Sequence, residues 1–206
     1  MTYPFGCIEQ TSSAVFPLVA IKNLVTQGVI PEIKPEDLDR FVKSGVERIL
    51  SMQLSSGAFS YWPRQNSASF WGSVYAAFAL EKAGQVGYDV PQASIQKALK
   101  YVRDNIFKSD AKADNNEQEW IKGWAILTLA EGKSLSHQDF EPIFKTYGSA
   151  DEETKALLLL TAQKIGYLPA KKLGAELKAL KISDQSVYSG LKGSVSRKQA
   201  AQWMAT

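Results

Sequence analysis

A single cysteine and the glutamine three residues after it are the residues whose types and spacing suggest covalent chemistry. Cys7 is the only cysteine among 206 residues, and with Gln10 it lies in the stretch YPFGCIEQTSS, residues 3–13. A lone thiol is compatible with a small buried hydrophobe, a nucleophile or one half of a covalent cross-link. The spacing bears on the third of these alternatives.

Residues three apart are neighbours at the start of a helix, so the two side chains can face each other there. A bond from the Cys7 sulfur to the side-chain carbonyl carbon of Gln10 would close a fifteen-membered ring. Attack by the thiolate would release ammonia and leave an internal thioester, an activated acyl group for any nucleophile that reaches it. Such a bond needs shelter from water, and the aromatic residues Tyr3, Phe5 and Phe16 are close in sequence. The spacing alone leaves a buried, inert thiol open.

Composition and charge narrow the classes of function. The chain is 45% hydrophobic and 22% charged, with a net charge of +3, as in an ordinary globular domain. Its densest basic cluster, within residues 171–181, has the spacing of a solvated helix face, and no aromatic residues interleave with it. The longest apolar run, residues 156–162, is too short to cross a bilayer. We therefore expect no nucleic-acid partner, no transmembrane segment, and no metal or cofactor.

Helical periodicity dominates the chain, and strand signals are scarce. Ser136 is a predicted helix cap with Asp139 in a variant capping box, and Ser149 is a second predicted cap. The helix after Ser149 carries four consecutive leucines and is apolar nearly all round, as a helix of an inner layer must be. The other predicted helices cover residues 35–52, 70–83, 95–106, 117–130, 169–181, and from 196 onward.

About nine helices joined by turns with glycine and proline suggest helical hairpins stacked into an arc or ring. The last helix has only begun at residue 196 when the sequence stops, so we expect the ring to be incomplete. The loop at residues 53–63, QLSSGAFSYWP, resembles a repeat of α/α-toroid proteins such as terpenoid cyclases and prenyltransferases, in which the glutamine amide ties a helix end to a neighbouring turn. Gln53, Gly57 and Phe59 carry this pattern. A glycine helix stop followed by core aromatics is the other interpretation.

The stretch around Cys7 closely resembles the thioester motif of the α2-macroglobulin and complement family. The motif reads Gly-Cys-x-Glu-Gln, here residues 6–10, and the flanking tyrosine, proline and threonine are similar to the bacterial branch. The resemblance continues through residues 48–63 and 70–91, and beyond residue 129 it depends on helical pattern alone.

This resemblance implies a fold, a reaction and a setting. The fold would be an all-α, α/α toroid, with residues 1–206 as a single thioester-containing domain fragment of a larger multidomain protein. Cys7 would be the thiol partner and Gln10 the acyl donor, while we expect Glu9 to be structural. The parent would be a protease inhibitor in the periplasm or cell envelope. Cleavage of a bait region elsewhere would expose the thioester, which would acylate a lysine of the attacking protease.

Two departures from the family pattern matter. Some relatives use a histidine to transfer the acyl group to hydroxyls, but the segment expected to carry it, residues 106–120, has none. The single histidine, His137, is predicted to be an exposed first-turn residue, so we expect direct attack by amines. The second departure is length, because the family's domain usually continues through further helices.

Three other functions remain open. An isoprenoid cyclase would need an acidic cluster, and the nearest, Asp37-x-Asp39, lies where first-turn acids compensate a helix dipole. A cysteine hydrolase would have to pair Cys7 with His137. A passive helical scaffold needs neither. Loss of ammonia separates the single-use thioester inhibitor from all three.

Overall fold

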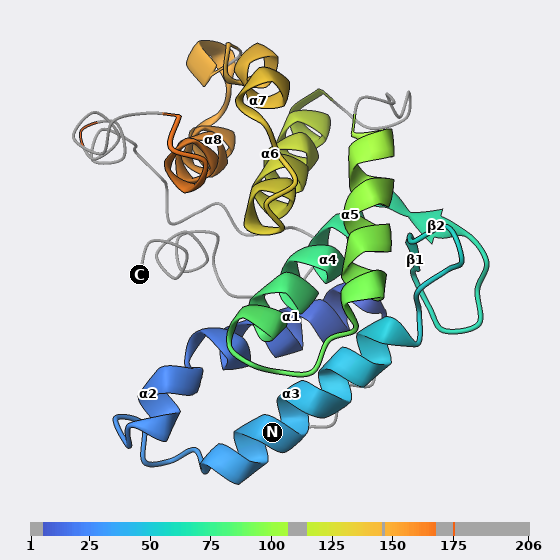
Figure 1. Ribbon diagram of the computed structural model, residues 1–206, viewed down its shortest axis with the longest axis vertical. Coiled ribbons are helices and arrows are strands. Elements are labelled where there is room, and N and C mark those ends of the chain that lie inside the picture. Colours follow the sequence, from blue (N-terminus) through green and yellow to red (C-terminus); the bar gives the residue numbers. More distant parts are fainter. Residues whose placement is uncertain (1–5, 107–114, 146, 168–174, 176–206) are drawn as a thin grey trace. The chain divides into compact units, whose positions relative to one another are not determined.

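The computed structural model describes residues 6–106, 115–145, 147–167 and 175. Within these ranges the chain forms eight α-helices and two strands of two residues each, which confirms the predicted all-helical class (Figure 1). The chain divides into two compact units, Met1–Phe107 and Lys108–Thr206. Each unit is described by itself.

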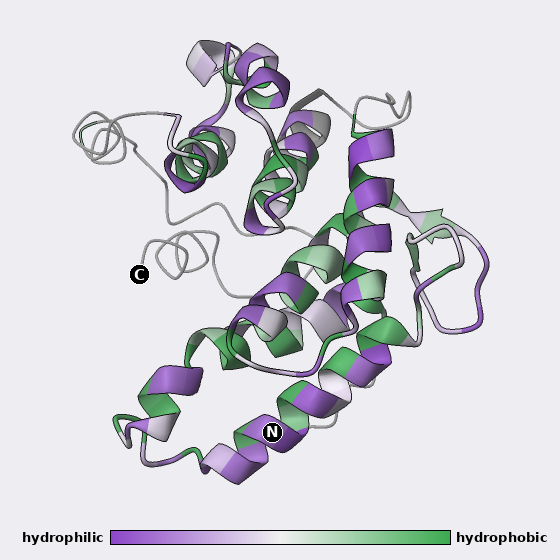
Figure 2. Ribbon diagram, viewed as in Figure 1, coloured by the Kyte–Doolittle hydropathy of each residue, from purple (hydrophilic) through white to green (hydrophobic). Residues whose placement is uncertain are grey.

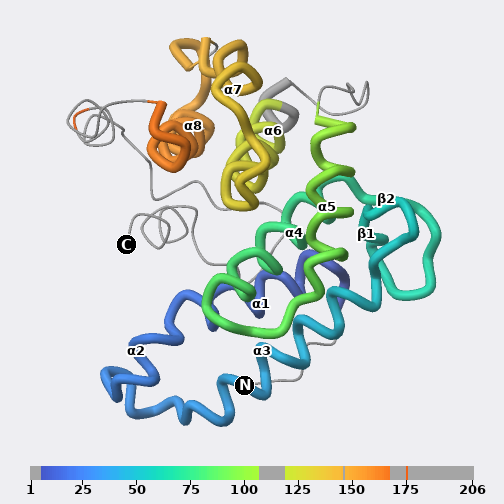
Figure 3. Tube along the Cα trace, viewed as in Figure 1, coloured from blue at the N-terminus to red at the C-terminus, as the bar shows by residue number. Residues whose placement is uncertain are grey.

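The first unit is built on three long helices in mutual contact. α1 packs against both α3 and α4, and α5 packs against α4, as the chain trace allows the reader to follow (Figure 3). The short helix α2 and a two-strand hairpin complete the unit. The elements are α1 (Ile8–Ala20), α2 (Lys22–Thr26), α3 (Pro35–Leu50), β1 (Phe59–Ser60), β2 (Ala68–Ser69), α4 (Phe70–Gln85) and α5 (Gln92–Asn105).

Glycines let α1 approach both of its neighbours closely. A Cβ atom added to Gly45 in α3 would overlap the Val15 side chain, and one added to Gly72 in α4 would lie 2.6 Å from Cγ2 of Ile8. Val15 and Ile8 are buried, so neither side chain has room to move away. The position of α1, and of the residues at its start, is therefore fixed from two sides.

The loop after α3 has both features that its sequence suggests, a glutamine tie to a neighbouring turn and a glycine turn followed by a core aromatic. Gln53 Nε2 donates hydrogen bonds to the carbonyl oxygens of Ser94, at 2.9 Å, and Gly57, at 3.3 Å. Gly57 has a φ of +90°, and a Cβ there would overlap the backbone of Lys97. Phe59 is fully buried. The glutamine thus ties this loop to the start of α5, and the glycine turn delivers an aromatic side chain to the core.

The second unit consists of α6 (Asn115–Glu131), α7 (His137–Phe144), a 3₁₀ turn at Tyr147–Ser149, and α8 (Glu152–Lys164). α6 packs against α8. Residues 156–162 of α8 are all buried, as the sequence predicts for an inner helix, and the apolar positions can be seen along it (Figure 2). None of the helices in the described part of the chain is long and apolar enough to cross a membrane.

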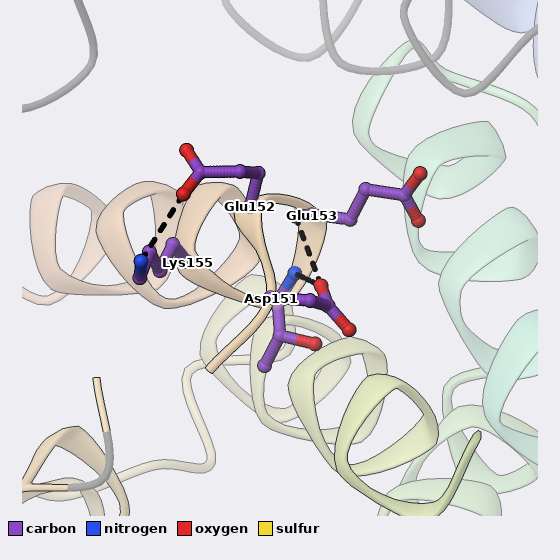
Figure 4. Close-up of polar contacts among 5 residues, drawn as sticks. Asp151, Glu152, Glu153 and Lys155 are labelled. Carbon is purple, nitrogen blue, oxygen red and sulfur yellow. Dashed lines mark hydrogen bonds and ion pairs between the residues drawn. The ribbon is translucent and has the colours of Figure 1, made fainter. Parts of the chain in front are cut away.

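One of the two predicted caps in this unit is right and the other is wrong. Ser136 and Asp139 form the expected capping box at the start of α7. α8, however, begins after Asp151 rather than at Ser149, because the Asp151 carboxylate accepts hydrogen bonds from the backbone N–H groups of Glu153, at 3.0 Å, and Thr154, at 2.8 Å (Figure 4). One carboxylate satisfies two of the free N–H groups at the helix start.

Two sequence predictions cannot be compared with the fold. The helix predicted at residues 169–181 has only residue 175 within the described ranges, and the one predicted from residue 196 lies outside them. α2 is a helix that the sequence analysis does not predict. Its five residues are too few to show a periodic pattern.

Candidate functional site

Cys7 and Gln10 lie together at the first turn of α1. Cys7 is the N-cap residue, in an extended conformation, and Gln10 is the third residue of the helix. The backbone N–H of Cys7 donates a hydrogen bond to Oε1 of Gln10 at 3.2 Å, so the glutamine side chain folds back over the cap. In this capping box the cysteine side chain takes the position that a serine or threonine hydroxyl usually occupies. The thiol and the carboxamide thus share one helix end.

Gly6 makes this arrangement possible by its lack of a side chain. A Cβ atom at Gly6 would lie 2.8 Å from both Cβ and Oε1 of Gln10 and 3.5 Å from its carbonyl carbon. The reason for glycine is therefore the close approach of Gln10. The sequence shows the glycine, but its reason becomes visible only when the glutamine side chain is in place.

The thiol and the carboxamide differ in their exposure. Cys7 is 4% exposed and the neighbouring Ile8 is fully buried, whereas Gln10 is exposed. Of the three aromatics expected to shelter the pair, Tyr3 and Phe5 lie outside the described residues. Phe16 lies six residues after Gln10 and nine after Cys7, which is roughly 9 Å and 13.5 Å further along the helix, and it packs edge-to-face on Phe78 instead, with ring centroids 5.2 Å apart.

Two other segments hold the start of α1. The N–H of Ile8 donates to the carbonyl oxygen of Tyr61 at 3.0 Å, and Nη2 of Arg48 donates to the carbonyl oxygen of Gly6 at 3.3 Å. Tyr61 and Trp62, in the loop that receives Ile8, are 38% and 44% exposed, and their rings meet edge-to-face at 5.9 Å. Sequence reasoning missed both contacts, because neither Arg48 nor Tyr61 carries a local signal for a partner some forty or fifty residues away.

Glu9 faces α4. It is half-buried, and burial raises its pKa. Burial likewise raises the pKa of Tyr75 in α4, with a smaller opposing effect from the hydrogen bond with Ser13 and a further increase from the negative charge of Glu9. Ser13 Oγ donates to the Tyr75 hydroxyl at 3.2 Å, and Trp71 stacks on the Tyr75 ring at 5.2 Å. The half-buried position of Glu9 and its effect on Tyr75 agree with the expected structural role.

The residues required by the alternative functions have other partners. His137 is exposed at the first position of α7, as expected, and its Nε2 donates to the carbonyl oxygen of Ile165 at 2.8 Å. Asp37 pairs with Arg40 at 2.7 Å, whereas Asp39 accepts a hydrogen bond from the Tyr88 hydroxyl at 2.6 Å. The two aspartates thus do not converge on one point.

The surroundings of Asp39 do not suit an isoprenoid. The open groove there, of about 430 Å³, is lined by Glu36, Asp39, Arg40, Lys43 and Ser44. A hydrocarbon chain needs mainly apolar walls. Among the described residues, no three His, Cys, Asp or Glu side chains gather into a cluster that could hold a metal ion.

Known proteins are similar to the part of the chain that contains Cys7 and Gln10. A model of the A-macroglobulin TED domain, the thioester domain, matches residues 1–120. The α2-macroglobulin of Escherichia coli K12 is 28% identical over 208 residues, which cover 96% of this chain and 13% of that protein. The α2-macroglobulin of Xylella fastidiosa Temecula1 is 30% identical over 121 residues, covering 56% of this chain and 7% of its own length. The chain therefore spans a small part of the relatives it matches.

Solved structures show the same fold. Trypsin-activated E. coli α2-macroglobulin superposes with a TM-score of 0.70 at 23% identity, covering 86% of this chain and 13% of that one. A native E. coli fragment from domain MG7 to the C-terminus gives a TM-score of 0.70 at 25% identity, covering 91% and 30% of the two chains. The α/α-toroid class expected from the sequence is the class of this domain. Since the domain model matches more than half of the residues, the chain belongs to the A-macroglobulin TED domain family.

Proposed function

We propose that Cys7 and Gln10 form an internal thioester, and that residues 1–206 are a thioester-containing domain fragment of a bacterial α2-macroglobulin that traps proteases covalently. One observation carries the proposal. The Cys7 N–H group lies 3.2 Å from Oε1 of Gln10, with the cysteine side chain facing the same helix turn. This contact supports the proposal, because it holds the side chain that carries the acyl carbon against the residue that carries the thiol.

Formation of the thioester needs no co-reactant. The Cys7 sulfur attacks the side-chain carbonyl carbon of Gln10, and a carbon–sulfur bond forms while the carbon–nitrogen bond of the carboxamide breaks. The nitrogen leaves as ammonia and takes the thiol proton with it. The product is one ammonia lighter than the sequence.

Acyl transfer consumes the bond, so the protein is an inhibitor that acts once rather than an enzyme with turnover. An amine, such as a lysine of the target protease, attacks the carbonyl carbon and forms an amide. The carbon–sulfur bond breaks, and the amine proton goes to the released thiolate. We propose no role in the transfer for the single histidine, His137, whose Nε2 donates to the Ile165 carbonyl oxygen. Direct attack by amines fits this arrangement.

The relatives support a proposal for the partners and the location. Structures of E. coli α2-macroglobulin are described as activated by trypsin and by porcine elastase, and a Salmonella one as reacted with methylamine. Proteases, methylamine and neighbouring domains of a longer parent protein are therefore the partners that we propose here. We propose an extracytoplasmic location, in the periplasm or cell envelope.

The experiment is an intact-mass measurement of the full-length protein with and without methylamine. We expect the untreated protein to be one ammonia lighter than its sequence, and methylamine to add its own mass while releasing one titratable thiol. We expect the Cys7→Ser variant, which replaces one small side chain by another, to keep the fold and to show neither change. An untreated mass equal to the sequence, with no methylamine adduct, would contradict the thioester and favour a scaffold.

A further inference from the structure

Arg48, in the last turn of α3, contacts the peptide unit that precedes the cysteine. Its Nη2 donates to the carbonyl oxygen of Gly6 at 3.3 Å. The N–H of that same peptide unit belongs to Cys7 and donates to Oε1 of Gln10 at 3.2 Å. A guanidinium, one peptide unit and the glutamine carbonyl therefore form a continuous chain of two hydrogen bonds.

The first hydrogen bond in such a chain strengthens the second. A cation on the carbonyl oxygen withdraws electron density from the peptide unit, so its N–H becomes a better donor. Oε1 of Gln10 is the atom on which negative charge develops when sulfur or an amine attacks the adjacent carbon. A donor already directed at this oxygen stabilises that charge without reorganisation, and hydrogen bonds to an ionised oxygen are shorter than neutral ones.

The setting makes the charge effective. Nε of Arg48 is buried and has no hydrogen-bond acceptor among the residues that the structure describes. Electrostatic interactions are stronger there than in water. The charge is favourable at the C-terminal end of α3 and unfavourable at the N-terminal end of α1, where the dipole is already positive. Arg48 thus brings a second positive field to the point where the glutamine oxygen lies.

We propose that Arg48 is a positioning residue for thioester chemistry, acting through the Gly6–Cys7 peptide unit to make the Cys7 N–H an oxyanion donor to Gln10. This inference rests on the proposed thioester. In both thioester formation and acyl transfer to an amine, the carbonyl carbon of Gln10 gains a bond and Oε1 takes the electron pair of the double bond. The pair returns when the leaving group departs, as ammonia during formation or as thiolate during acyl transfer. Arg48 itself gains and loses no proton.

The test is a series of three substitutions in the full-length protein. Arg48→Lys keeps a positive charge, Arg48→Gln keeps a neutral donor, and Arg48→Met keeps only bulk. Arg40→Gln is the matched control, since Arg40 lies exposed on the same helix and pairs with Asp37. The measurements are the fraction of protein that has lost ammonia and the second-order rate constant of thiol release by methylamine. Thermal melting followed by circular dichroism reports the folded state of each variant.

We expect the rate constant to fall in the order wild type, Lys, Gln, Met. The total loss should be about tenfold, less than the 10²–10³ typical of removing a direct oxyanion donor, because Arg48 acts through a peptide. Arg40→Gln should react like the wild type. If Arg48→Met fails to fold, the comparison of Lys with Gln still decides, since a purely structural tie gives no reason for a charged variant to react faster than a neutral one.

Equal rates in all folded Arg48 variants would overturn the role of Arg48 while leaving the thioester intact. A wild-type protein without ammonia loss or methylamine-released thiol would overturn the thioester, and the inference about Arg48 with it.

Discussion

At the scale of single residues, the geometry at the start of α1 requires a residue without a side chain at position 6. Gly6 has no Cβ, and the Gln10 side chain fills the space where that atom would be. In Gly6→Ala the new methyl group would lie 2.8 Å from Oε1 of Gln10, so the glutamine must turn away from Cys7. We expect this variant to fold and to lose the thioester. The intact mass of the full-length variant should equal its sequence.

Gly148→Ala provides the control, because a Cβ there meets nothing within 4 Å and its φ is not in the left-handed region. It should lose ammonia as the wild type does. Normal thioester content in Gly6→Ala would show that the fit between Gly6 and Gln10 is not required for the reaction.

The half-buried carboxyl of Glu9, in the first turn of α1, predicts that the stability of the protein depends on pH. Burial raises its pKa, so the folded protein binds the proton more tightly than the unfolded chain does. Stability therefore falls as the pH rises from the ordinary carboxyl pKa through the raised one. We expect Glu9→Gln to raise the melting temperature at pH 7 and to leave it nearly unchanged in acid, where the carboxyl is protonated in both states.

The control is Glu36→Gln, which removes an exposed acid from the first turn of α3. It loses only a favourable interaction with the helix dipole and should lower the melting temperature slightly. A lower melting temperature for Glu9→Gln at pH 7 would mean that the dipole outweighs burial at Glu9 as well.

At the scale of elements, the contact between α1 and α3 depends on Gly45. A Cβ there would overlap the buried Val15 side chain, so the two helices must move apart or Val15 must leave its rotamer. We expect Gly45→Ala to destabilise the protein by about 1–3 kcal/mol, as overpacked cores do. Denaturant unfolding of the purified chain measures it.

Gly84→Ala is the matched change in another helix. The nearest atom to its Cβ would be Cδ1 of Ile95, at 4.0 Å, an ordinary contact. Alanine is a better helix former than glycine, so this variant should gain up to about 0.5–1 kcal/mol. If both variants shift stability in the same direction, helix propensity rather than the α1–α3 contact governs these positions.

Local patterns predict most of the elements, but they do not decide between two competing caps and do not reveal contacts between distant residues. The long helices follow from apolar periodicity, and the Ser136 cap from its own side chain. The predicted start of α8 is wrong, because Ser149 and Asp151 are both good cap residues by type. The structure favours Asp151, whose carboxylate accepts hydrogen bonds from two backbone N–H groups. At the site, the spacing of Cys7 and Gln10 is readable in sequence. Arg48 is not, because its partner is 42 residues away.

At the scale of the whole molecule, the described residues that form the candidate site all belong to the first unit. Gly6, Cys7, Gln10, Arg48 and Tyr61 all lie within Met1–Phe107, and the family model, which matches residues 1–120, covers this whole unit. This unit supplies the geometry for the reaction, since α1 is held by α3, α4 and the loop at Tyr61. Shelter from water is a separate requirement, and here the exposed carboxamide of Gln10 matters.

We expect the 206-residue chain, expressed alone, to hold the thioester poorly. Cys7 is 4% exposed, but the acyl side of the bond would lie on the exposed Gln10, and Tyr61 and Trp62 present 38% and 44% of their surface beside the loop that receives Ile8. Water that reaches the carbonyl carbon leaves glutamate at position 10, and a carboxylate is a poor acyl donor, so the bond cannot reform.

Mass spectrometry should find the isolated chain at its sequence mass, or heavier by the exchange of the amide for an acid, while the full-length protein is one ammonia lighter. The Cys7 thiol should titrate slowly in the folded chain, because it is buried, and rapidly after unfolding. A stable ammonia deficit in the isolated chain, with release of the thiol by methylamine, would show that the 206-residue chain shelters the bond without the rest of the parent protein.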